Sequence, residues 1–104
     1  MDVRLIYITA GSADEAAKIG RTLVEERHAA CANVLAGVRS FYWWEGKLED
    51  SPEAVLIAKT RAAKVDRLVA RVKALHSYSC PCVVALPIEA ANKAFLDWIA
   101  AETA

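Results

Sequence analysis

Three side chains that can bind soft metal ions lie within seven residues of one another near the end of the chain. His76, Cys80 and Cys82 belong to the stretch HSYSCPC, which leads directly into the apolar run VVALP. If the backbone from Cys80 to Cys82 is extended, both thiols lie on the same side of the chain, where the imidazole of His76 can join them. Thiolate and imidazole groups suit Cu(I) or Zn²⁺. The stretch therefore predicts a metal site built from these three residues.

The same residues also have a purely structural interpretation. Free cysteine is among the most buried residue types, so Cys82 at the start of an apolar strand can serve as a small core residue. His76 at the end of a helix can complement the helix dipole. A disulfide between Cys80 and Cys82 would close a strained ring and is disfavoured. The metal site and the structural alternative both stay open.

The composition indicates one folded domain over residues 1–104. Apolar residues make up 56% of the chain and charged residues 25%, which is typical of a protein with a packed core. Thirteen basic and thirteen acidic residues cancel, so no overall field favours nucleic acid or a membrane as a partner. The apolar runs are shorter than the roughly 20 residues that span a bilayer, and the start lacks a secretion signal. We expect a cytoplasmic protein with three reduced cysteines.

Hydrophobic periodicity and turn signals predict four strands and three helices. Ser12 and Glu15 form a capping box that opens the first helix. Glu45-Gly46 is a turn signal between two long strands, and Pro52 suggests a bulge or an edge in the second of them. The expected elements are strand 3–9, a helix from residue 12, strands 32–44 and 47–60, helix 61–76, a buried strand 82–88 and a helix 92–103 with Phe95, Trp98 and Ile99 facing inward.

This order predicts an α+β fold, a ferredoxin-like βαββαβ sandwich with a long hairpin and an extra C-terminal helix. Both main helices then cover one face of the sheet, and the other face stays uncovered. Along the hairpin, Phe41 and Trp43 point one way while Tyr42 and Trp44 point the other. One monomer cannot bury both sets of rings, so we expect a homo-oligomer assembled through sheet faces and projecting hairpins.

Motifs for other functions of this fold are missing from the sequence. The strand EAVLIAKT has no aromatic residues for stacking RNA bases, and three cysteines are too few for an iron–sulfur cluster. Glycine-rich phosphate loops and recognisable nucleophile motifs do not occur. We therefore expect a protein that is not an enzyme and requires no cofactor, although it can take up copper or zinc.

The segments ACANVL, SFYWWEGKLE and HSYSCP, with LPI and the tryptophan-bearing C-terminal helix, resemble the CutA divalent-cation tolerance protein family along nearly the whole chain. The resemblance implies a small cytoplasmic homotrimer with an architecture similar to the PII signalling proteins. It also implies a link to divalent-metal tolerance and to copper binding. No catalytic reaction comes with it.

By position, the resemblance implies a cleft between subunits that draws on Tyr42, Trp44, Glu45, Lys47, Glu49, Lys59 and Tyr78, next to His76. The chain departs from the family where Ser77 replaces a proline, where Cys82 replaces a glutamate, and where Ile8 replaces a cysteine that some relatives offer to copper. Two hypotheses follow. Either the protein binds transition metals through His76, Cys80 and Cys82, or it is a PII-like scaffold whose cleft binds a small anionic ligand or a protein partner.

Overall fold

The computed structural model describes residues 2–104, which form one four-stranded antiparallel sheet and its helices. The strand order β2-β3-β1-β4 is that of a ferredoxin-like sandwich, and it confirms the predicted fold class. The elements are β1 (Val3–Ala10), α1 (Ala13–Glu25), β2 (Cys31–Trp44), β3 (Lys47–Arg61), a 3₁₀ turn (Ala62–Lys64), α2 (Val65–Leu75), β4 (Val83–Pro87) and α3 (Lys93–Glu102).

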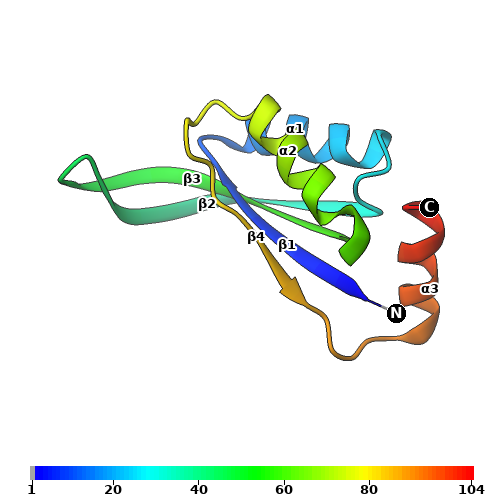
Figure 1. The fold of residues 1–104 in the computed structure, drawn as a ribbon. Coiled ribbons are helices and arrows are strands. Elements are labelled where there is room, and N and C mark those ends of the chain that lie inside the picture. The colour runs from blue at the N-terminus through cyan, green and yellow to red at the C-terminus, as the bar shows by residue number, and fades with distance from the viewer. Residues whose placement is uncertain (1) are drawn as a thin grey trace.

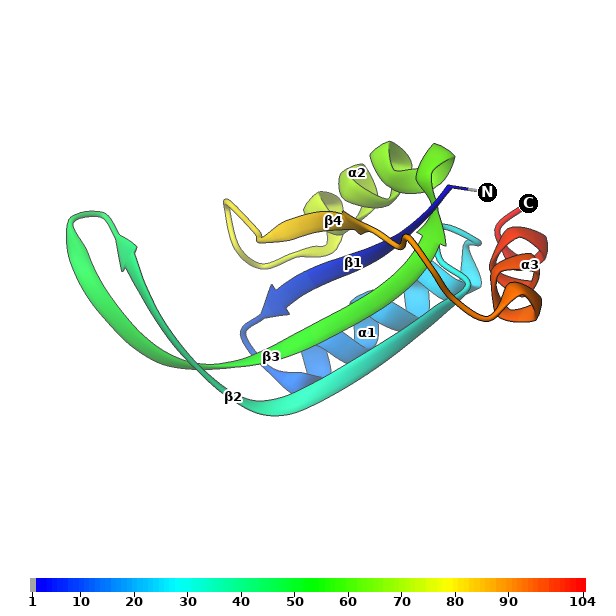
Figure 2. The ribbon, with the colours of Figure 1, turned by 90° about the horizontal axis from the view of Figure 1, so that it is seen from below.

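The core lies between one face of the sheet and the helices α1 and α2, which both cover that face (Figure 1). Ile6 and Ile8 of β1 and Leu56 of β3 pack there against Ile19 and Leu23 of α1. Alternate residues of the same strands point to the opposite face, because side-chain direction in a strand has a period of two. Figure 2 views the sheet from that second side, and we call it the open face.

The β2-β3 hairpin projects well beyond the body of the domain, as its length predicts (Figure 1). Its turn residues Glu45 and Gly46 both have positive φ, 50° and 79°, as a type I′ turn requires. The ladder is interrupted between Leu35 and Val38, where Gly37 at φ 75° supplies a bulge. The bulge thus lies in β2, whereas Pro52 of β3 stays in register and exposed.

Two predictions about burial are wrong for the single chain. β4 is an edge strand rather than a buried one, and its open-face residues Val84 and Leu86 are each 48% exposed. In α3 only Ile99 is buried, whereas Phe95 and Trp98 stack on each other and stay partly exposed. The reason is the position of α3 at one end of the sheet (Figure 2). There only the side of the helix that carries Leu96 and Ile99 packs against the core.

Candidate functional site

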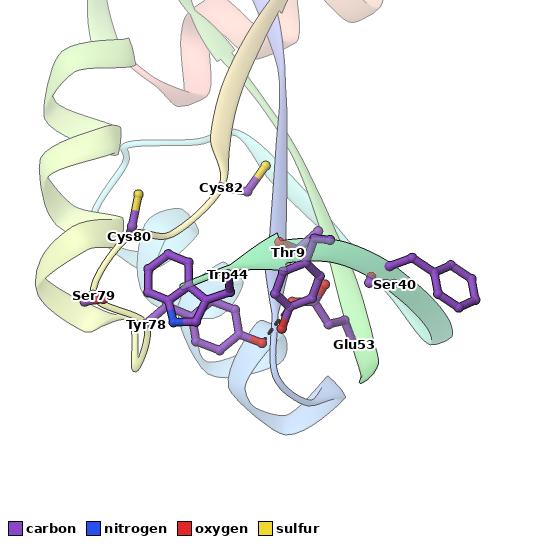
Figure 3. Close-up of a pocket in the computed structure, with 10 residues that line it drawn as sticks. Thr9, Ser40, Trp44, Glu53, Tyr78, Ser79, Cys80 and Cys82 are labelled. Carbon is purple, nitrogen blue, oxygen red and sulfur yellow. Dashed lines mark hydrogen bonds between the residues drawn. The ribbon is translucent and has the colours of Figure 1, made fainter. Parts of the chain in front are cut away.

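A pocket with a volume of about 530 Å³ opens where the hairpin leaves the body of the sheet. The pairing between β1 and β3 ends at Ala54, and Glu53 is the first residue beyond it. Glu53 and Thr9 alternate with buried core residues, so they lie on the open face. The pocket draws on three strands and the loop between α2 and β4, and its lining residues are Thr9, Ser40, Phe41, Tyr42, Trp44, Glu53, Tyr78, Ser79, Cys80 and Cys82 (Figure 3).

Glu53 and Tyr78 form a hydrogen-bonded pair at this pocket. The Tyr78 hydroxyl donates to Glu53 Oε2 over 2.8 Å (Figure 3), and only 8% of Glu53 is exposed. Within residues 2–104, Glu53 has no lysine, arginine or histidine partner. Burial raises the pKa of Tyr78, and its hydrogen bond to the Glu53 carboxylate raises that pKa further. Tyr78 therefore stays a protonated donor.

His76 is held by hydrogen bonds at both ring nitrogens. The Tyr78 N–H donates to His76 Nδ1 over 3.0 Å, which means that Nδ1 carries no proton in this arrangement. His76 Nε2 then carries the proton and donates it to the Thr9 carbonyl at 2.7 Å. The pairing of β4 with β1 ends at Ile8, so the imidazole continues the hydrogen bonding along this edge of β1. The side chain of His76 is fully buried.

In this geometry neither ring nitrogen of His76 is free to bind a metal beside Cys80 and Cys82, and the metal site of all three residues stays a prediction. A nitrogen that binds a metal needs a free lone pair, but the lone pair of His76 Nδ1 already accepts the hydrogen bond from the Tyr78 N–H. The part of the chain that the structure describes contains no group of three His, Cys, Asp or Glu residues arranged to hold a metal ion. His76 positions the Tyr78 loop instead.

The two thiols are more exposed than the structural alternative expects. Cys80 and Cys82 are both exposed and both line the pocket, so neither is a core residue of the single chain. Figure 3 shows their sulfur atoms directed away from the Tyr78 hydroxyl. Cys31 is half-buried, with its Sγ 3.9 Å from Lys59 Nζ. Cys80 and Cys82 thus remain available to a soft ligand.

Glu15 ties the Tyr78 loop to the start of α1. The Ser12 hydroxyl caps the helix by accepting from the Glu15 N–H over 3.1 Å, as predicted. The Glu15 carboxylate does not reach back to Ser12, but accepts from the N–H groups of Gly11 (3.1 Å) and Ser77 (2.8 Å). Partial burial acts to raise the pKa of Glu15, but the hydrogen bonds from Ser77 and Gly11 outweigh it, so this pKa is lowered.

Replacing Glu15 with glutamine should weaken this tether. The amide group has one acceptor oxygen, so one of the two N–H groups loses its partner, and we expect a loss of about 1 kcal/mol in unfolding free energy at pH 7. Because the pKa of Glu15 is lower in the folded chain, its contribution is complete above the unfolded pKa of ~4.3 and disappears as the pH falls through the folded value. Guanidinium unfolding at pH 7 and pH 3, at fixed protein concentration, measures this.

The control for that experiment is Glu89→Gln, which makes the same chemical change at an exposed position. This variant should have the same unfolding free energy as the parent protein at both pH values. A difference between Glu15→Gln and the parent that stays the same at pH 3 would contradict the role given to the carboxylate.

The structure brings together only part of the predicted cleft. Tyr42, Trp44 and Tyr78 line the pocket. The other four residues do not line it: Glu45 belongs to the hairpin turn, Lys47 pairs with Trp44 and Glu49 with Tyr42 across the hairpin, and Lys59 bonds to Asn33 Oδ1 at 3.3 Å. Both lysines therefore lie outside the pocket of the single chain, and the cleft between subunits stays a prediction.

Glu53 is the residue that sequence reasoning missed, together with Thr9, Ser40, Phe41 and Ser79 as lining residues. The sequence contains only a partial signal for it. Glu53 is a single carboxylate at the start of the apolar run AVLIA, at a position that the strand period places on the same face as Val55 and Ile57. The same strand face also carries Glu49 and Lys59, however, so the pattern by itself does not single out Glu53.

Comparison with known proteins identifies the family. The model of the CutA1 divalent ion tolerance protein family matches residues 4–102. The chain belongs to this family. The CutA divalent-cation tolerance protein of Archaeoglobus fulgidus is 50% identical over 94 residues, which cover 90% of this chain and 91% of that protein. Solved CutA structures superimpose closely: the one from A. fulgidus has a TM-score of 0.94 at 46% identity, covering 98% of this chain and 99% of that one. The Thermus thermophilus Cut A1 structure has a TM-score of 0.95 at 41% identity, with the same coverage.

The CutA family is named for cation tolerance and not for a reaction. The solved A. fulgidus protein is described as periplasmic, so the cytoplasmic location of this CutA chain stays a prediction. Within residues 2–104, the helices are too short or too polar to cross a membrane.

Proposed function

We propose that this CutA-type protein contributes to divalent-cation tolerance by binding a thiophilic metal ion, copper above all, through Cys80 and Cys82. The observation that carries the proposal is the exposure of both thiols at one pocket with a single residue between them. Two thiolates suit Cu(I), which soft sulfur ligands select. Zinc fits less well, because protein zinc sites are almost always four-coordinate, and the other two ligands would have to be water or groups of another copy.

Titration of the reduced protein with Cu(I) against a competing chelator tests this proposal. We expect about one Cu(I) per chain, with release of thiol protons on binding. The double substitution Cys80→Ser and Cys82→Ser should abolish the uptake, whereas Cys31→Ser, which alters a half-buried thiol away from the pocket, should keep it. If the double variant takes up as much Cu(I) as the parent protein, Cys80 and Cys82 are not the copper ligands.

We also propose that the chain assembles as a homotrimer through its open face and hairpin, with the pocket at the rim of this interface. Support comes from large apolar side chains that one chain leaves exposed on this side and at the hairpin, among them Leu35, Val84, Leu86, Trp43 and Leu48. Exposed apolar surface of this extent is typical of a protein interface. The number of subunits follows from the family resemblance.

A second candidate function is the binding of a small ligand in the pocket, as in a PII-like scaffold. The observation that favours it is a concave site with four aromatic residues and one hydrogen-bonded polar pair, the half-buried Tyr78 and the buried Glu53. A neutral aromatic probe such as benzyl alcohol should then shift the NMR signal of the Trp44 indole N–H in metal-free buffer. An unchanged signal up to high millimolar concentration would count against the pocket as a ligand site.

A further inference from the structure

We propose that the pocket selects small organic cations, in which an ammonium group is attached to an aromatic or apolar body, with Glu53 as the counter-ion. This inference rests on the proposal that the pocket binds a small ligand, and it specifies the charge of that ligand. It is opposite in sign to the anionic ligand that the sequence suggests.

The charge of the pocket carries the first step. Glu53 is the single acidic residue among the ten that line it, and none of the ten is lysine, arginine or histidine. Of the basic side chains on the hairpin, Arg39 makes two hydrogen bonds to Asp50, at 2.9 and 2.8 Å, and Lys47 pairs across the ladder with Trp44 without lining the pocket. Glu53 is 8% exposed, and its Oε1 is not one of the fully buried atoms that lack a partner, so the carboxylate reaches the pocket and attracts a cation there.

The hydrogen bonding of Glu53 carries the second step. Tyr78 donates to Oε2, and within residues 2–104 the other oxygen, Oε1, accepts no hydrogen bond. Tyr78 stays protonated, because burial and the neighbouring carboxylate both raise its pKa, so it adds no second negative charge. One carboxylate oxygen is thus already oriented by the protein, and the other is left for a donor from the ligand. An anionic group in the same place would meet Glu53 at close range, which is repulsive.

The aromatic rings carry the third step. Trp44, Tyr42 and Tyr78 all line the same pocket as Glu53 (Figure 3). The faces of tryptophan and tyrosine rings attract ammonium groups through the ring quadrupole, and tryptophan does so best. A carboxylate beside such rings favours a cation that also carries an apolar body, over a small hydrated metal ion or a sugar.

Three probes of one shape and different charge test the inference. Benzylammonium, benzyl alcohol and benzoate are titrated separately into the metal-free protein, with the Trp44 indole N–H followed by NMR. We expect benzylammonium to bind about tenfold more tightly than benzyl alcohol, ~1.4 kcal/mol, and benzoate to bind least. If benzoate binds as well as benzylammonium, the charge inference is overturned while the pocket remains a ligand site. If no probe binds, both proposals fail.

Glu53→Gln identifies the counter-ion. The amide keeps the size of the side chain and an oxygen to accept from Tyr78, so circular dichroism should show the parent fold. We expect benzylammonium to lose its tenfold advantage over benzyl alcohol in this variant. Glu89→Gln is the control for the loss of a carboxylate, since Glu89 is exposed and does not line the pocket, and it should keep the advantage. An unchanged preference in Glu53→Gln overturns the assignment, and the comparison of probes on the parent protein holds whether or not this variant folds.

Discussion

Replacing Leu86 with aspartate is expected to convert the protein to monomers at micromolar concentration. Leu86 lies on the open face of the edge strand β4, paired in register with Leu5, and is 48% exposed in the single chain. If another copy covers this face, the new carboxylate is taken out of water without a partner. That costs several kcal/mol for each interface, roughly 3 or more, and lowers the association constant more than a hundredfold. Sedimentation equilibrium measures the mass directly.

The control for this substitution is Ala74→Asp, which adds the same charge to an exposed position of α2 on the helical side of the sheet. It should leave the mass at that of a trimer. A parent protein that sediments as a monomer would contradict the assembly, and so would a Leu86→Asp variant that stays trimeric.

Replacing His76 with alanine should reduce the free energy of unfolding by about 3 kcal/mol. The ring is fully buried, and its removal leaves a cavity and two backbone groups, the Thr9 carbonyl and the Tyr78 N–H, without the partners they have now. Denaturant unfolding at fixed protein concentration gives the difference.

His76→Gln should recover part of this loss, because the glutamine amide can donate to the Thr9 carbonyl in place of Nε2. Both variants, measured where they are folded, should keep the Cu(I) uptake of the parent protein, because Cys80 and Cys82 are unchanged. Parent-like stability of His76→Ala would contradict the positioning role of the imidazole. Loss of copper uptake in folded His76→Ala would show that the imidazole is a metal ligand.

Much of the fold follows from local patterns in the sequence. The turn at Glu45-Gly46 and the Ser12 cap depend on neighbours within a few residues, and both appear as predicted. Burial is harder to predict, because it depends on which face of an element another element covers. The apolar residues of β4 and the rings of α3 look like core residues in the sequence, and the single chain leaves them exposed.

The candidate site also combines features that the local sequence predicts with features that depend on tertiary contacts. The sequence by itself determined the fold class, the family and the presence of two thiols and several rings near the hairpin. Only the tertiary structure decided that His76 is bonded to Thr9, 67 residues away, and that Tyr78 meets Glu53, 25 residues away. The physical reason is that a side chain's role depends on which lone pairs and donors are already satisfied. Those partners come from β1 and β3, whose distance from residues 76–82 is set by how the chain folds and not by the local sequence.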